Sequence, residues 1–151
     1  MSIYSQNLPK ISHYLGIDFG TAKIGLALAD MEMEMAFIYQ NIANDKKMLE
    51  NLAKIVEKEN IKKIIIGKSG KLAGSNVAQK SFNIEEIGKK IEKELGVPVL
   101  YHEEMFTTKM AQDNLKERGE KNIKKYDDRE AARIILQDWL DKIQLSQVKA
   151  G

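Results

Sequence analysis

The order of the apolar segments limits the folds open to this chain more than any other feature of its sequence. Three short apolar runs at 14–19, 23–29 and 35–41 have the length and composition of strands, and a tight turn at Gly20 separates the first two. Strands joined by short turns pair antiparallel. The first part of the chain is therefore predicted to form a three-stranded antiparallel meander.

The pattern changes after the third strand, where helical and strand-like segments alternate. Apolar residues at helical spacing predict helices and β-branched runs predict strands. In chain order these segments are 48–56 (helix), 61–66 (strand), 76–95 (helix), 97–101 (strand), 107–118 (helix) and 127–143 (helix). Strands linked through helices run parallel, with right-handed connections. We therefore expect an α/β fold, a five-stranded mixed sheet in which the antiparallel meander is followed by two parallel strands, flanked by helices.

The length of 151 residues suits one domain, which the pattern places at 13–143, between flexible termini at 1–12 and 144–151. Hydrophobic residues make up 43% of the chain, which is enough to build a core. The sequence lacks the run of about 18 apolar residues that a membrane helix needs. Residues 1–10 contain no apolar run, which argues against a secretory signal. We expect a cytoplasmic protein without membrane contact.

The composition excludes several kinds of site. The chain has no cysteine, which rules out disulfides, thiolate zinc sites, iron–sulfur clusters and cysteine nucleophiles. Its only histidines are His13 and His102, too few for a histidine-rich metal site. A metal would have to be a hard cation held by carboxylates, which favours Mg²⁺ or Mn²⁺.

Acidic side chains occur at three places that the expected topology would bring together. Asp18 lies within the first strand, Glu103 and Glu104 directly follow the strand at 97–101, and Asp128 lies in the first turn of the last helix. An aspartate in an apolar strand is costly unless it is paired or bound to metal. Sites form at the carboxyl ends of parallel strands. We interpret these acids as a carboxylate cage in which two metal ions would activate water and stabilise the leaving oxygen of a phosphodiester.

Each acid also has a purely structural interpretation. Asp18 could cap the turn at Gly20, and the two glutamates could be exposed loop residues. Asp127 with Glu130 three residues later fits a capping box. Asp128 differs, because small and apolar residues continue its helical stripe. These continuing residues are Ala131, Ala132, Ile135 and Trp139.

Basic and small residues follow the buried strand at 61–66, before a predicted helix. Backbone amides at a helix N-terminus bind phosphate well. Gly67-Lys68-Ser69 resembles the end of a P-loop, but Lys62 stands where that motif needs its first glycine, so nucleotide hydrolysis by that route is excluded. The alternative is a solvated surface loop. The candidate contacts to substrate phosphates are Lys23, Lys68, Lys71 and Ser75.

Four segments carry a family resemblance when they are taken in order. They are LGIDFGTAKIGLALAD at 15–30, IIIG at 64–67 with Gly74-Ser75 after it, EEMFTT at 103–108 and DREAARIILQ at 128–137. In this order and spacing they resemble the YqgF family, also called RuvX. The resemblance extends over about residues 13–143.

This resemblance implies an RNase H-like fold and a metal-dependent nuclease, a hydrolase of phosphodiester bonds that matures the end of pre-16S ribosomal RNA during ribosome biogenesis. The family's catalytic acids fall on Asp18, Glu104 and Asp128, which selects Glu104 over Glu103. The same three acids are then the expected ligands of Mg²⁺ or Mn²⁺. The expected partner is a structured RNA, and branched DNA is the second possibility.

The sequence departs from the family pattern at two places. Glu103 and Met105 replace an aspartate and an arginine beside the catalytic glutamate, and Lys68-Ser69 replaces Leu-Pro after the fourth strand. Loss of the arginine removes a bidentate contact that lysine replaces only as a point charge. Two other functions therefore stay open, a Holliday junction resolvase and a catalytically weak nucleic-acid-binding module. A stable two-fold dimer would favour the resolvase, whereas a monomer or weak homodimer is expected of the RNA nuclease.

Overall fold

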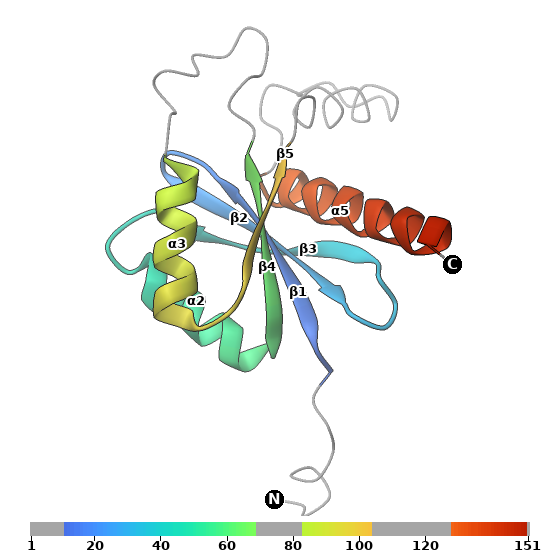
Figure 1. The fold of residues 1–151 in the computed structure, drawn as a ribbon. Coiled ribbons are helices and arrows are strands. Elements are labelled where there is room, and N and C mark those ends of the chain that lie inside the picture. The colour runs from blue at the N-terminus through green and yellow to red at the C-terminus, as the bar shows by residue number, and fades with distance from the viewer. Residues whose placement is uncertain (1–10, 69–82, 104–127, 151) are drawn as a thin grey trace, which may run out of the picture.

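The computed structural model describes residues 11–68, 83–103 and 128–150 (Figure 1). In chain order the elements are β1 (His13–Phe19), β2 (Lys23–Asp30), β3 (Ala36–Ala43), α2 (Met48–Lys58), β4 (Ile61–Lys68), α3 (Ile84–Leu95), β5 (Val99–Glu103) and α5 (Asp128–Ala150). The predicted helix at 107–118 lies outside the described residues, as does the 76–82 part of the helix predicted at 76–95.

Within the described residues, five strands form one mixed sheet in the order β3-β2-β1-β4-β5. The strands β1, β2 and β3 pair antiparallel in sequence, whereas β4 pairs parallel to β1 and β5 pairs parallel to β4. This arrangement confirms the predicted meander followed by two parallel strands. The carboxyl ends of β1, β4 and β5 therefore all lie at the same end of the sheet (Figure 1).

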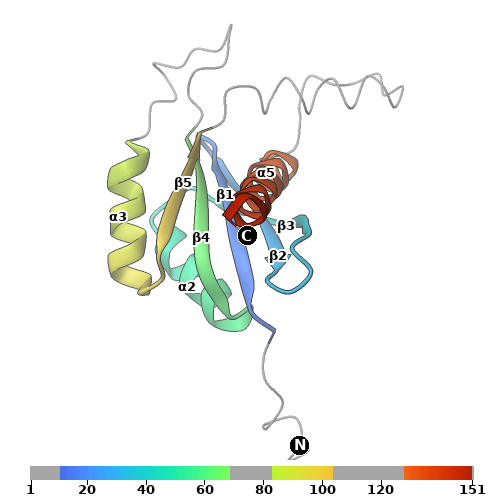
Figure 2. The same cartoon turned by 45° about the vertical axis from the view of Figure 1, so that its right-hand side comes forward.

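Helices cover the two faces of the sheet, with α2 and α3 on one face and α5 on the other (Figure 2). Leu15 and Ile17 of β1 join the apolar core on the α2–α3 face, together with Leu52 of α2 and Ile91 of α3. A second core packs α5 against the other face. Its buried members are Ala27, Ala29, Ala36, Ile65, Ala132, Ile135, Leu136 and Leu140. Side chains alternate along β1, so Gly16 and Asp18 face α5.

Small residues let α5 lie unusually close to the sheet. A Cβ atom added to Gly16 would stand 2.9 Å from the carbonyl oxygen of Ala132 and 2.9 Å from Cβ of Leu136. A Cβ atom on Gly25 of β2 would stand 2.6 Å from the backbone nitrogen of Arg129. These distances are well inside ordinary contact. At the Gly16 and Gly25 positions beneath this helix, any larger residue would collide with α5.

Several predicted boundaries of strands and helices were wrong by a few residues. The last strand was predicted at 97–101 but begins at Val99, because Pro98 has no backbone N–H to donate to the sheet. The third strand was predicted at 35–41 and runs instead over Ala36–Ala43. The last helix was predicted to end at 143, with a flexible tail after it, yet α5 continues to Ala150. The predicted stop at Gly96 is confirmed, since this residue ends α3 with a φ of 69°.

Within residues 11–68, 83–103 and 128–150, no helix is both long enough and apolar enough to cross a membrane.

Candidate functional site

Asp18 and Asp128 come from different elements that meet on the α5 face of the sheet. Asp18 of β1 is paired directly with Gly25 of β2. Residues directly opposite in an antiparallel pair project to the same face. A Cβ atom on Gly25 would run into the backbone carbonyl group of Asp128. The first residue of α5 therefore lies over the sheet position next to Asp18, and both acids are half-buried.

The turn between β1 and β2 also lies beside the first residue of α5. The N–H of Gly20 donates to the carbonyl oxygen of Lys23 at 2.8 Å, which closes the turn. A Cβ atom on Gly20 would stand 3.3 Å from Oδ2 of Asp128. The backbone of the turn thus passes beside the Asp128 carboxylate, where a side chain would crowd it.

Asn44 braces the same turn and was missed in the sequence. Its side-chain N–H donates to the carbonyl oxygen of Gly20 at 2.7 Å, and its backbone N–H donates to the carbonyl oxygen of Ala22 at 2.9 Å. The sequence signal was weak, because an asparagine just after a strand reads as an ordinary turn residue. Its two contacts hold the loop beside Asp18 in one conformation.

The carboxyl ends of β4 and β5 lie at the same end of the sheet as Asp18. Glu103 is the last residue of β5, not a residue after the strand as predicted, and it pairs in register with Lys68 at the end of β4. Glu103 is exposed. Glu104, the third predicted catalytic acid, lies outside the described residues, as do Lys71 and Ser75.

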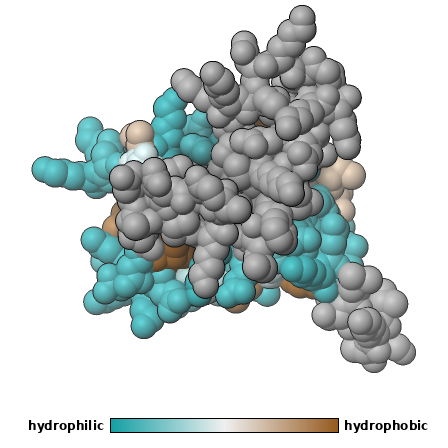
Figure 3. Space-filling model, turned by 90° about the horizontal axis from the view of Figure 1, so that it is seen from above, coloured by the Kyte–Doolittle hydropathy of each residue, from teal (hydrophilic) through white to brown (hydrophobic). Residues whose placement is uncertain are grey.

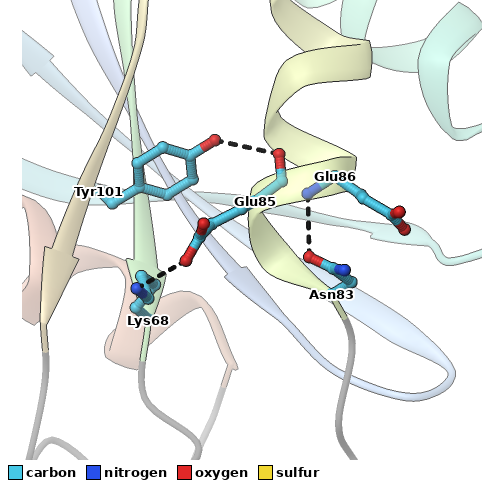
Figure 4. A network of polar contacts seen from close by, with 5 residues as sticks. All are labelled: Lys68, Asn83, Glu85, Glu86 and Tyr101. Atoms are coloured by element: carbon cyan, nitrogen blue, oxygen red, sulfur yellow. Dashed lines mark hydrogen bonds and ion pairs between the residues drawn. The ribbon is translucent and has the colours of Figure 1, made fainter.

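Lys68 is engaged by an acidic side chain at the start of α3 (Figure 4). Its Nζ donates to Oε1 of Glu85 at 2.9 Å. This hydrogen bond, together with the charge of Glu85, raises the pKa of Lys68 and lowers the pKa of Glu85. The Tyr101 hydroxyl donates to the carbonyl oxygen of Glu85 at 3.3 Å, and Asn83 caps α3 by accepting from the N–H of Glu86 at 3.1 Å. A phosphate would have to compete with Glu85 for Lys68.

Lys23 lies at the first residue of β2, exposed, directly after the turn that closes on Gly20. It is therefore at the same end of the sheet as Asp18. Viewed onto this end, the described surface that is not covered by grey atoms is mostly hydrophilic, with a few apolar areas (Figure 3).

Two of the three predicted metal ligands can be placed, and their chemistry fits a hard cation. Asp18 and Asp128 offer carboxylate oxygens on one face of the sheet, the donor type that Mg²⁺ and Mn²⁺ prefer. Among the described residues there is no group of three histidine or acidic side chains able to hold a metal. The complete cage thus stays a prediction that depends on Glu104.

Comparison with known proteins assigns the family. The model of the family described as "RuvX: Holliday junction resolvase" matches residues 12–142. The chain belongs to the RuvX family. This match spans nearly the whole chain and confirms the resemblance to the YqgF (RuvX) family that the four sequence motifs indicated.

Similar proteins of the RuvX family carry the name "Putative pre-16S rRNA nuclease". One from Maridesulfovibrio salexigens is 32% identical over 130 residues, which cover 83% of this chain and 96% of the relative. Another, from Orientia tsutsugamushi, is 34% identical over 139 residues, which cover 88% of this chain and 86% of the relative. The similarity therefore extends over essentially the full length of both proteins.

Solved structures support the fold. The Thermus thermophilus RuvC, solved in complex with a Holliday junction substrate, matches with a TM-score of 0.56 and 14% identity, covering 88% of this chain and 96% of that one. The fowlpox virus resolvase, solved with Holliday junction DNA, gives a TM-score of 0.51 and 14% identity, covering 87% and 98%. The predicted RNase H-like α/β fold is thereby confirmed.

Proposed function

We propose that this chain is a metal-dependent nuclease that hydrolyses phosphodiester bonds in structured RNA, and that pre-16S ribosomal RNA is its substrate. Family membership and the name shared by its relatives support this proposal. We place its activity in the cytoplasm, as a monomer or weak homodimer, where ribosomal precursors are processed.

One observation carries the proposal. Asp18 is paired with Gly25, and the first residue of α5 lies directly over Gly25. The position of Asp18 and the first residue of α5 are therefore neighbours, at a point where a helix packs almost in backbone contact with the sheet. Both side chains are half-buried and end in carboxylate oxygens, the donors that a hard divalent cation prefers. This arrangement supports a site for a divalent cation.

The proposed ligands of Mg²⁺ or Mn²⁺ are Asp18, Glu104 and Asp128, and these residues are also the proposed catalytic acids. When bound, two such ions lower the pKa of water and stabilise the charge on the attacking and leaving oxygens. The three acids would hold the two ions and orient them toward the phosphodiester. Water attacks phosphorus, the bond to one ester oxygen breaks, and that oxygen leaves with a proton.

The proposed contacts to substrate phosphates are Lys23, Lys68, Lys71 and Ser75. The exposed position of Lys23 beside the Gly20 turn supports its part. To bind a phosphate, Lys68 would leave the Glu85 carboxylate. Both partners are anions, so Lys68 would keep an ion pair in either state.

A Holliday junction resolvase is the second candidate, favoured by the description of the family model. A resolvase cuts two strands symmetrically and so requires a two-fold dimer. The two candidates therefore differ in substrate and in assembly.

The deciding experiment compares cleavage of pre-16S RNA and of a four-way DNA junction by the purified protein with Mg²⁺ or Mn²⁺. Light scattering of the same sample gives the oligomeric state. Cleavage of the RNA by a monomer supports the proposal, and selective cleavage of the junction by a stable dimer supports the resolvase. Binding without any cleavage would indicate a nucleic-acid-binding module.

Asp18→Asn tests the carboxylate site directly. Loss of a metal ligand should cost more than the ~10–100-fold typical of residues one shell further out, so cleavage should fall by more than ~100-fold. RNA binding should persist, and the thermal midpoint without metal should stay the same or rise, because one of the repelling charges is gone. Asp127→Asn is the matched control, since asparagine caps a helix as well as aspartate does. If the two variants cleave equally well, the proposed site is wrong.

A further inference from the structure

His102 of β5 is a buried polar side chain in the described structure, and its partner, Asp138, lies on α5. It belongs to β5 and is 6% exposed. Its Nε2 lies 2.6 Å from Oδ2 of Asp138 on α5. The same carboxylate oxygen lies 3.3 Å from Nζ of Lys142, on the exposed side of the helix. A partly buried hydrogen bond thus joins the end of β5 to α5.

The position of β5 explains why this bond matters. Among the described strands, β5 lies at the edge of the sheet and pairs with β4 alone. Side chains alternate along it, so Tyr101 faces α3, where its hydroxyl donates to Glu85, and His102 faces α5. Leu100, the other residue on the α5 side, is 36% exposed. On this face, His102 is the buried side chain of β5 that reaches the helix.

The hydrogen bond also lies level with the candidate site. His102 pairs with Gly67 of β4, and the residue before Gly67 pairs with Ile17 of β1. If the pairing of β1 with β4 continues by one residue, Asp18 is paired with Gly67, and Asp18, Gly67 and His102 are neighbours on adjacent strands. Asp18 and His102 both face α5. The helix that His102 contacts is the helix that begins with Asp128.

We propose that His102 is a positioning residue for the metal site. By donating to Asp138 it fixes the carboxyl end of β5, which the structure describes up to Glu103, against α5, the helix that begins with Asp128. This inference rests on the proposed function, because Glu104 and Asp128 are the proposed ligands. His102 itself contacts neither metal nor substrate.

The test uses the full chain, with His102→Phe as the main variant. Phenylalanine fills the space of the ring but cannot donate a hydrogen bond. Asp138 keeps 46% of its side chain exposed, so water can replace the lost donor and the variant should fold. His102→Gln restores an N–H donor and is the rescue. Lys142→Ala removes the exposed contact to the same carboxylate and is the matched control.

Two quantities are measured on each variant: Mn²⁺ affinity, from the free-ion signal in electron paramagnetic resonance, and the Mg²⁺ dependence of pre-16S RNA cleavage. Residues that orient metal ligands change affinity by ~10–100-fold, and an indirect contact belongs at the lower end. His102→Phe should therefore weaken Mn²⁺ binding about tenfold and raise the half-saturating Mg²⁺ similarly, with most of the rate recovered at saturating metal. His102→Gln should recover most of the affinity, and Lys142→Ala should match the wild type.

Folded His102→Phe with wild-type Mn²⁺ affinity would overturn the inference, as would a His102→Gln variant no better than His102→Phe. If His102→Phe fails to fold, Asp138→Ala replaces it under the same expectation. If the wild type binds Mn²⁺ but cleaves no substrate, the proposed function fails while the Mn²⁺ comparison still decides the role of His102. If the wild type binds no Mn²⁺, both proposals fall.

Discussion

Gly25→Ala should separate the start of α5 from the sheet and thereby disable the candidate site. The added Cβ atom would stand 2.6 Å from the backbone nitrogen of Arg129 and closer still to the carbonyl group of Asp128. Carbon atoms make favourable contacts at about 3.5–4.0 Å. All of the obstructing atoms belong to backbone, so no rotamer change can relieve the clash. The first turn of α5 must therefore retreat by about 1 Å.

The size of the effect follows from this displacement. Overpacking of a tightly packed core costs about 1–3 kcal/mol. For a chain of this length each kcal/mol lowers the thermal midpoint by about 2–4 °C. A misplacement of about 1 Å in a catalytic group costs about 100-fold in rate. Gly25→Ala should thus cleave pre-16S RNA about 100-fold more slowly at a temperature where the protein is still fully folded.

Gly67→Ala is the matched control for this experiment. The three atoms nearest to its Cβ atom would all belong to the side chain of Ile135, which can turn away, and not to the backbone of α5. It should lose comparable stability and keep most of its activity. Cleavage is measured as initial rate at saturating Mg²⁺, and folding by circular dichroism. Wild-type activity in folded Gly25→Ala, or equal losses in both variants, would refute the argument that close helix packing positions Asp128.

Two further predictions concern charges around the sheet. Glu85→Gln releases Lys68 from its ion pair, so RNA binding should tighten and its salt dependence should become steeper. Lys68→Ala should instead weaken RNA binding and make its salt dependence shallower. An unchanged salt dependence in both variants would show that Lys68 does not contact phosphate. Burial, and then the hydrogen bond to Glu59 and its charge, raises the pKa of Tyr39 from 10.0 to about 12. Because the folded state holds this proton more tightly, the stability it contributes is complete below pH ~10 and is lost as pH rises towards about 12. Urea unfolding of the wild type and Tyr39→Phe should therefore converge over that range, and a constant difference would contradict the assigned contact.

The hydrophobic pattern was sufficient to predict the sheet, because its strands are marked by features that act locally. The run Ile64–Ile66 is β-branched and fully buried, and the Gly20 turn forces the chain back on itself. Boundaries that depend on pairing were harder. The third strand extends to Ala43 because that residue pairs with Lys23, and neither residue type predicts this contact. The helix continues to Ala150 because no proline or glycine interrupts it before Gly151.

The candidate site was predictable only as far as topology alone could place its residues. Asp18 and Asp128 were identified from their apolar surroundings, and both are found on the α5 face of the sheet. The Lys68–Glu85 ion pair was not foreseen, because it depends on where α3 begins relative to the end of β4. The burial of His102 was missed as well. An isolated histidine beside two glutamates looks exposed until the helix that covers it is known.

The glycines of the central strands have a cost that their position explains. Glycine weakens a strand, since it loses more backbone freedom on folding and contributes no packing. Gly16 of β1 and Gly25 of β2 nevertheless lie beneath α5 at positions where any larger residue would collide with the helix. An aspartate side chain is short, so carboxylates from a strand and from a helix can share one cation only if the two backbones lie close together. Gly16 and Gly25 thus weaken their strands but allow the close helix packing that the proposed site would need to combine Asp18 of the sheet with Asp128 of the helix.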